Sequence, residues 1–266
     1  MLFASDLDRT LIYSSGFIQD IKDKESIQLI ETKEDQPISY MTRQAVDLLK
    51  EISKCLLFIP TTTRTITQYK RIKIFQQEIK SKYAIVSNGG NILYNGNVDE
   101  DWKKRIKSLF LNESYQLSDV LNQFNEIKGN WVLRSHTADD MFGYLIVDEE
   151  KIPHNELKGF KDWAHNINWK ISLQGRKLYL IPEYICKGKA VEYIAERENK
   201  STILAAGDSL LDLPMLEKAH YAITPVHGEL YKNVDIQTIK HISVAANEGI
   251  LAAEEILKEI LFQINK

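Results

Sequence analysis

Short apolar runs alternate with helical patterns at both ends of this chain of 266 residues, and this alternation limits the possible fold more than any other feature. The apolar runs end at turn-forming residues, and each helical pattern carries one apolar stripe. Strands that alternate with helices are typical of a parallel sheet with helices on both faces. The predicted strands are 2–5, 55–59, 83–87, 202–208 and 220–224, and the predicted helices are 43–53, 66–81, 187–199, 213–218 and 249–264.

The segment 91–180 has a different pattern. Helical stretches come first and are followed by two strands, one helix and two further strands, which indicates an α+β unit with hairpins. We therefore expect a doubly wound, Rossmann-like α/β core of residues 1–88 and 182–266, with an α+β domain of residues 91–180 inserted in it. A hairpin is predicted at 26–41, before the second core strand. Within the insertion, the predicted helices are 100–112, 116–127 and 154–166, and the predicted strands are 131–137, 141–148, 169–174 and 177–182.

The composition favours an ordinary globular protein, with 44% hydrophobic and 27% charged residues. A net charge of −3 argues against a broad basic surface for nucleic acid. No stretch approaches the ~20 apolar residues that span a bilayer, and Met1 leads directly into the first strand without a signal peptide. We expect a cytoplasmic protein that acts on a small molecule and binds neither nucleic acid nor membrane. The sequence does not predict an oligomeric state.

Polar and charged residues follow several of the predicted strands at their carboxyl ends. Ligands of open parallel sheets bind at this edge, so these side chains are candidates for one site. The first two acids, Asp6 and Asp8, lie two positions apart and would repel each other without a positive partner. The full set is Asp6, Asp8 and Thr10, then Thr61 to Thr63, then Asn88, Gly89 and Gly90, and finally Asp208 and Asp212, with Lys187 at the start of a helix.

A divalent cation would relieve this repulsion. Mg²⁺ takes oxygen ligands and is commonly held by one or two carboxylates together with a substrate phosphate. Asp6, Asp8 and Asp208 come from two strand ends and offer such ligands, and Lys187 can offset further negative charge. The sequence therefore predicts a Mg²⁺ site at this edge of the sheet.

The same residues form the motifs of a known superfamily. The chain resembles the haloacid dehalogenase-like superfamily in four motifs, which span residues 6 to 216 and therefore most of the sequence. The insertion lies where that family carries its larger cap domain. SNGG at 87–90 and KLYLIPEYICKGKA at 177–190 resemble the Cof-type and sucrose-phosphatase-like branches. The motifs are D-x-D-x-T at 6–10, a threonine at 62, Lys187 in KGKA, and GDSLLDLPML at 207–216.

The resemblance implies a catalytic role for four residues. Asp6 would be the nucleophile that takes the phosphoryl group. Asp8 would protonate the leaving oxygen and then activate water. Thr62 and Lys187 would hold the phosphoryl oxygens. An aspartate two positions after the nucleophile marks phosphoryl transfer in this superfamily, whereas dehalogenases lack it.

The resemblance also implies a set of metal-binding residues. Asp6, Asp208 and the main-chain carbonyl of Asp8 would bind Mg²⁺, and Asp212 would support the metal or Lys187.

Asn88 and Gly89 would touch the substrate, although a tight turn explains the glycines equally well. Arg64 would meet a second anionic group or cap a helix. Trp102, Trp131, Trp163 and Trp169 would form the core of the inserted domain or a sugar-stacking surface.

Three residues depart from the family pattern. Arg9 and Thr63 stand where glycines are common, and Leu211 replaces an asparagine before the second acid of the fourth motif. Thr61 and Thr63 also stay open as alternatives to Thr62. None of these changes removes a reacting group.

The expected function is therefore Mg²⁺-dependent hydrolysis of a small phosphomonoester through a phosphorylated aspartate, with sugar phosphates as the leading substrate class. A phosphomutase or phosphotransferase would use the same site with a hydroxyl acceptor. A non-catalytic phosphate-binding regulatory module is the remaining alternative. The loss of Asp6 or Asp208 would have indicated such a module, and both are present.

Overall fold

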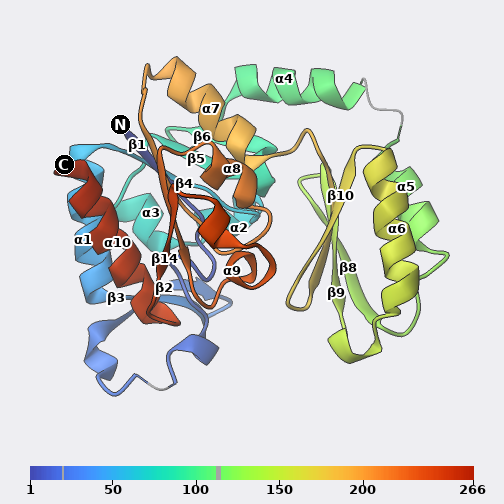
Figure 1. The fold of residues 1–266 in the computed structure, drawn as a ribbon, viewed down its shortest axis with the longest axis horizontal. Coiled ribbons are helices and arrows are strands. Elements are labelled where there is room, and N and C mark those ends of the chain that lie inside the picture. Colours follow the sequence, from blue (N-terminus) through green and yellow to red (C-terminus); the bar gives the residue numbers. More distant parts are fainter. Residues whose placement is uncertain (20, 112–114) are drawn as a thin grey trace. The chain divides into compact units, whose positions relative to one another are not determined.

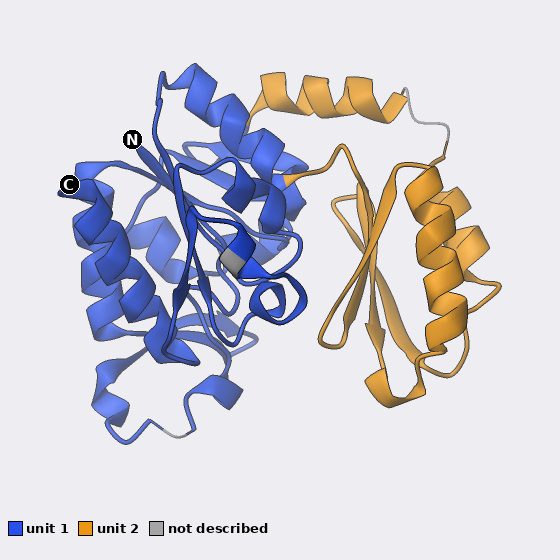
Figure 2. Ribbon diagram, viewed as in Figure 1, with its two compact units in different colours: residues 1–98, 187–266 blue, residues 99–186 orange. Residues whose placement is uncertain are grey.

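The computed structural model describes residues 1–19, 21–111 and 115–266, which form two compact units (Figure 2). Unit 1 comprises Met1–Val98 and Lys187–Lys266, and unit 2 comprises Asp99–Cys186. The sequence placed the two junctions at 88–91 and at 180–182. In the structure, β6 (Asn91–Tyr94) pairs with β5 (Tyr83–Val86) and so stays in unit 1. β11 (Lys177–Pro182) pairs with β10 (Trp169–Gln174) to its last residue and stays in unit 2.

Unit 1 is built on a five-stranded parallel sheet, which confirms the predicted doubly wound α/β core. The strand order is β14-β13-β12-β1-β4, and every neighbouring pair is parallel. The strand β14 was missed in the sequence because it is only four residues long and only its first and last residues are buried. The bounds are β1 Leu2–Ser5, β4 Leu57–Pro60, β12 Ile203–Ala206, β13 Tyr221–Pro225 and β14 Ile242–Ala245.

The predicted strand at 83–87 lies outside this ladder. It forms β5, which belongs to a separate antiparallel sheet in the order β5-β6-β7, with β7 at Asn97–Val98. A single parallel bridge between Thr61 and Ile85 still joins β5 to the chain that leaves β4. The ends of the second and third predicted strands are therefore neighbours, although they do not share a sheet.

Helices flank the parallel sheet, and α1 and α10 pack side by side (Figure 1). The predicted N-cap of α1 is confirmed, because the Thr42 hydroxyl accepts from the amide of Ala45 at 3.0 Å. The single helix predicted at 66–81 is wrong: it is broken at Ile72, which is extended and bridges to Glu31. The helices are α1 Arg43–Cys55, α2 Ile66–Lys70, α3 Lys73–Gln77, α7 Lys187–Arg197, α8 Leu213–Glu217, α9 Glu229–Asn233 and α10 Ile250–Ile264.

The predicted hairpin is present as β2 (Ile27–Lys33) and β3 (Gln36–Thr42). Its turn residues Glu34 and Asp35 both have positive φ. The hairpin is tied to the loop after β1 by two main-chain hydrogen bonds between Tyr13 and Tyr40, at 3.0 and 2.8 Å. Its inner side chains are thus held close to the first motif.

Unit 2 contains a four-stranded antiparallel sheet in the order β10-β11-β9-β8. The helices α5 (Leu117–Phe124) and α6 (His154–Asn166) lie on one face of it (Figure 1). The apolar core beneath them includes Trp131 and Trp169, and Trp163 packs against it. The predicted helix 100–112 is α4 (Glu100–Leu111), and its residue 112 lies outside the described residues. The remaining strands are β8 Val132–Ala138 and β9 Phe142–Val147.

Five short 3₁₀ segments complete the described structure: Ser15–Phe17, Lys24–Ser26, Ser87–Gly89, Glu149–Lys151 and Ile236–Thr238. None of the helices in the described ranges has the length and apolar character needed to cross a membrane.

Candidate active site

The first predicted acid lies buried directly after β1. The amide of Asp6 donates to the carbonyl of Ala206 at 2.8 Å, so the pairing of β1 with β12 continues one residue past the strand. This pairing brings the first and fourth predicted motifs together. Asp6 and Asp208 are each only 5% exposed.

Lys187 joins the acids of these two motifs. Its ammonium donates to Oδ1 of Asp6 and to Oδ1 of Asp212, both at 2.6 Å, and its side chain is 1% exposed. The other oxygen of Asp212 accepts from the amide and the hydroxyl of Ser209, at 2.9 and 2.7 Å. Asp212 therefore has both oxygens engaged and holds Lys187 in place.

Two glycines make this close packing possible. A Cβ at Gly207 would lie 2.4 Å from Cβ of Asp212, and a Cβ at Gly188 would lie 2.4 Å from the carbonyl oxygen of Pro214. Any side chain at either position would push apart the segments that carry Lys187 and Asp212.

Burial of like charges shifts the pKa values of this cluster. Burial and the neighbouring Asp212 raise the pKa of Asp6 from 3.8 to about 7, against the opposing effect of Lys187. Burial and the carboxylates of Asp6 and Asp212 raise the pKa of Asp208 well above its ordinary value. Burial alone would lower the pKa of Lys187, but Asp212 and Asp6 raise it above its usual range, so Lys187 is charged.

Carboxylate oxygens of Asp6, Asp208 and Asp212 lie within 4.8 Å of one another. A hard cation suits this set, because oxygen ligands and uncompensated negative charge are what Mg²⁺ binds. Since Lys187 and Ser209 engage both oxygens of Asp212, Asp6 and Asp208 are the acids better placed to hold the ion. The proposed ligation by the Asp8 carbonyl stays a prediction.

The threonines after β4 have different partners. The hydroxyl of Thr61 donates to the carbonyl of Ile59 at 3.1 Å and is committed to the strand. The hydroxyl oxygen of Thr62 accepts from the amide of Arg64 at 3.1 Å, and a hydroxyl that accepts can still donate its own hydrogen. Thr62 is fully buried, whereas Thr63 is partly exposed. The geometry supports Thr62 as the phosphate-binding residue among the three, and this assignment stays a prediction.

Asn88 and Gly89 lie in the 3₁₀ segment that follows β5. The amide of Asn88 donates to the carbonyl of Thr62 at 3.0 Å, so this turn is attached to the threonine loop. Ser87 and Asn88 both have positive φ, at 51° and 57°, although neither is a glycine. Strained backbone of this kind is found at ligand sites, which agrees with the predicted contact of Asn88 and Gly89 with substrate but does not test it.

Arg64 is paired with two carboxylates of the chain. Its Nε and Nη2 donate to the two oxygens of Asp8 at 2.7 and 2.8 Å, and its Nη1 donates to Glu31 at 2.6 Å. The helix cap of α2 is formed by Thr65, whose hydroxyl accepts from the amide of Gln68. Glu31 was not predicted as a site residue. The available signal was an acid next to a buried apolar residue, Ile30, on a strand of the predicted hairpin.

The contacts of Arg9 account for its presence at a position where the family commonly has glycine. Its φ is 65°, a left-handed conformation that glycine adopts without strain. Contacts on several sides hold it: Nη2 donates to the carbonyl of His227 at 3.2 Å, Nε lies 3.7 Å from Asp208, and the guanidinium lies over the ring of Phe17. The family glycine is thus replaced by a residue that places positive charge beside an acid of the site.

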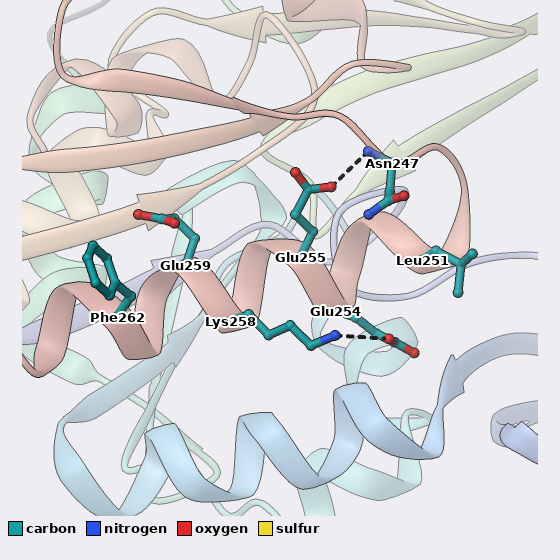
Figure 3. A pocket seen from close by; sticks show the side chains of 7 residues that line it. All are labelled: Asn247, Leu251, Glu254, Glu255, Lys258, Glu259 and Phe262. Carbon is teal, nitrogen blue, oxygen red and sulfur yellow. Dashed lines mark hydrogen bonds and ion pairs between the residues drawn. The ribbon is translucent and has the colours of Figure 1, made fainter.

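A separate hollow runs along the outer side of α10, with a volume of about 460 Å³ (Figure 3). Acidic side chains dominate it, and Lys258 pairs with Glu254 while the amide of Asn247 donates to Glu255. None of the predicted site residues lines this hollow.

Comparison with known proteins identifies relatives over the whole length of the chain. The model of the family described as sucrose-6F-phosphate phosphohydrolase matches residues 1–255. No curated protein matches significantly.

Solved structures are similar in fold at low sequence identity. The sucrose-phosphatase from Synechocystis sp. PCC6803, in complex with sucrose and phosphate, is 15% identical with a TM-score of 0.71, and the match covers 100% of this chain and 98% of that one. A trehalose-6-phosphate phosphatase related protein is 15% identical with a TM-score of 0.52, and both chains are covered completely. A haloacid dehalogenase-like hydrolase from Bacillus subtilis is 16% identical with a TM-score of 0.54, covering 98% and 91%.

Proposed function

Because this chain belongs to the sucrose-6F-phosphate phosphohydrolase family and is a phosphatase, we propose that it hydrolyses a small sugar phosphate with Mg²⁺ through a phosphorylated Asp6. One observation carries the proposal. A fully buried Lys187 bridges Asp6 and Asp212 at 2.6 Å each, with the acid of Asp208 within the same cluster. Burying this much charge costs free energy even when the charges are paired, and such clusters with shifted pKa values are found mainly at functional sites.

The first step transfers the phosphoryl group to the protein. A carboxylate oxygen of Asp6 forms a bond to phosphorus, and the bond from phosphorus to the ester oxygen breaks. Asp8 gives its proton to the departing oxygen, so that the sugar leaves as an alcohol. Lys187 and the hydroxyl of Thr62 donate hydrogen bonds to the phosphoryl oxygens.

The second step returns the site to its starting state. A water oxygen bonds to phosphorus, its proton passes to the carboxylate of Asp8, and the bond between phosphorus and Asp6 breaks. Inorganic phosphate leaves, and Asp8 is again protonated for the next ester. Asp212 keeps the Lys187 ammonium in place through both steps, because it and Asp6 share that ammonium.

Asp6 and Asp208, with the main-chain carbonyl of Asp8, would hold Mg²⁺. The ion would offset the negative charge of the phosphoryl group and of the two acids. The raised pKa values of Asp6 and Asp208 support this, because a cation favours the ionised form that burial disfavours.

Unit 2 supports a sugar as the leaving group. Its helices α5 and α6 cover one face of the sheet, and His136, Tyr144 and Tyr179 are register partners on the other face. The rings of His136 and Tyr144 stack at 4.9 Å, and those of Tyr144 and Tyr179 lie 5.9 Å apart. Aromatic rings with polar edges are suited to the faces and hydroxyls of sugars. The four tryptophans lie in or against apolar cores, which is the first of the two roles expected for them.

A panel of phosphate esters tests the proposal. The purified protein should release free phosphate from sugar phosphates with Mg²⁺, lose this activity in EDTA and regain it with added Mg²⁺. Full activity in EDTA would contradict the metal assignment. Transfer of phosphate to a second sugar without release of free phosphate would instead identify a phosphomutase or phosphotransferase. Binding of phosphate without turnover of any ester would identify a regulatory module.

A further inference from the structure

Glu31 is a buried carboxylate that the proposed mechanism does not use. It lies on β2 of the hairpin and is 0% exposed. Oε2 accepts from Nη1 of Arg64 at 2.6 Å and from the hydroxyl of Ser39 at 2.7 Å. Oε1 accepts from Nε of Arg71 at 3.1 Å. Each of its oxygens is therefore directed at a specific donor.

Arg64 connects this buried acid to Asp8. Two of its nitrogens grip Asp8 as a fork, at 2.7 and 2.8 Å, while the third nitrogen is held by Glu31. The guanidinium is planar, so fixing Nη1 on Glu31 also fixes the direction of the other two donors. The Arg64 side chain is only 12% exposed, whereas that of Asp8 is 46% exposed. In the series Glu31–Arg64–Asp8, Glu31 is therefore the buried end and Asp8 is the end that faces solvent.

The fork is compatible with proton transfer. It uses one acceptor position on each oxygen of Asp8, and a carboxylate has about four such positions. The grip therefore sets the plane of the carboxylate and does not by itself prevent Asp8 from carrying a proton.

We propose that Glu31 is a positioning residue, which holds Arg64 so that Arg64 in turn orients Asp8 for proton transfer. This inference rests on the proposed function, because it assigns a purpose to the orientation of Asp8. The hairpin β2–β3 is then part of the proton-transfer apparatus, since it supplies both Glu31 and Ser39. A small displacement of Asp8 would be costly, because a misplacement of about 1 Å can reduce a rate ~10²-fold.

The choice of leaving group separates this role from a merely structural one. The leaving group of p-nitrophenyl phosphate is a stable aryloxide anion that needs little protonation. The leaving group of a sugar phosphate is an alkoxide unless its oxygen is protonated. The ratio kcat/KM covers the steps up to release of the alcohol. Glu31→Gln should therefore lower kcat/KM for glucose 6-phosphate by ~10–100-fold and that for p-nitrophenyl phosphate by less than ~3-fold.

Two further variants secure the comparison. Arg64→Lys keeps the positive charge but loses the fork, and should show the same contrast between the esters, which covers the case that Glu31→Gln does not fold. Glu198→Gln is the matched control, because Glu198 also pairs with a cation, Lys82 at 2.7 Å, but is remote from the proposed chemistry. It should leave both rates within about twofold of the wild type.

The outcomes are distinct. Equal losses on both esters, or a change in the melting temperature alone, would overturn the positioning role of Glu31. A raised KM in Arg64→Lys with no effect of Glu31→Gln would indicate that Arg64 contacts the substrate. If the wild type hydrolyses neither ester, the proposed function fails. A crystal structure of Glu31→Gln then decides the positioning: an Asp8 side chain that has left Arg64 supports it, and an unchanged pair contradicts it.

Discussion

The two units of the molecule differ in how many ionisable side chains they bury. In the described part of the chain, the buried ionisable side chains of unit 1 include Asp6, Glu31 and Lys187, with Asp208 and Asp212. Unit 2 has an apolar core of aromatic and aliphatic residues. Its ion pairs, such as Lys151 with Asp148, lie at the surface.

This difference indicates that unit 1 bears a free-energy cost of buried charge that unit 2 largely avoids. Buried charges cost free energy that an apolar core does not, and a buried ion pair is weak evidence for stability. In unit 1 these charges gather at the ends of β1 and β12 and behind Asp8, around the site proposed for phosphoryl transfer. Among its described residues unit 2 buries a single acid, Asp99, whose carboxylate accepts from the amide of Trp102 at 2.9 Å, and it has no cluster of buried charges. This agrees with a role in choosing the substrate.

The largest expected effect is that of removing an acid from the unit 1 cluster. Asp208→Asn should lower phosphatase activity by at least ~10²-fold, the size of losing one electrostatic stabiliser of the transition state. Steady-state release of phosphate measures this loss. The control is Asp101→Asn, which changes an exposed acid of unit 2 and should leave the activity unchanged.

The same variant should make the metal-free protein more stable. Asp6 and Asp208 have folded-state pKa values above their ordinary ones, so their contribution to stability is greatest at low pH and is lost as the pH rises, for Asp6 between about 4 and about 7. In EDTA, Asp208→Asn should therefore melt above the wild type at about pH 8, and the gap should narrow as the pH falls to about 5. A variant that melts below the wild type at both pH values would show that the acid supports the fold instead.

A smaller effect on activity, with a large one on stability, is expected in unit 2. Phe124 is 1% exposed and its ring lies 5.5 Å from that of Trp131. Phe124→Ala should cost about 3–5 kcal/mol of unfolding free energy in that unit, through loss of buried area and the cavity left behind. Hydrolysis of p-nitrophenyl phosphate should stay within about twofold at a temperature where the variant is folded. Denaturant unfolding and the aryl ester assay measure the two quantities.

The surface pair of unit 2 is the control. Lys151→Ala removes a contact that is 58% exposed on the lysine side, and should change stability by no more than about 0.5 kcal/mol. If Phe124→Ala abolished hydrolysis of the aryl ester while the protein stayed folded, the assignment of the chemistry to unit 1 alone would be wrong.

Local sequence patterns predicted the parallel sheet and the residues at its strand ends. The reason is physical: a buried strand needs an apolar run, and the acids of such a site follow directly where the run stops, as with Asp6 after Leu2–Ser5. The N-cap at Thr42 was equally local. In each case the determining residues are neighbours in the chain.

Long-range contacts account for what was missed. The break at Ile72 follows from its bridge to Glu31, which the helical pattern of 66–81 does not contain. The partners of Arg64 lie 33 and 56 positions away in the sequence, so neither pairing is visible in a local motif. The positive φ of Arg9 likewise becomes understandable only with His227 and Phe17 around it.

The central claim, that the buried cluster of unit 1 transfers phosphate through Asp6, has one direct test. Asp8→Asn should still take phosphate from p-nitrophenyl phosphate but should lack the base that activates water, so the phosphorylated protein should accumulate. Rapid quenching followed by mass spectrometry of peptides should find one added phosphoryl group on Asp6, absent when Asp6→Asn is combined with Asp8→Asn. A phosphoryl group on another residue, or none at all while Asp8→Asn still turns over at the wild-type rate, would contradict the account.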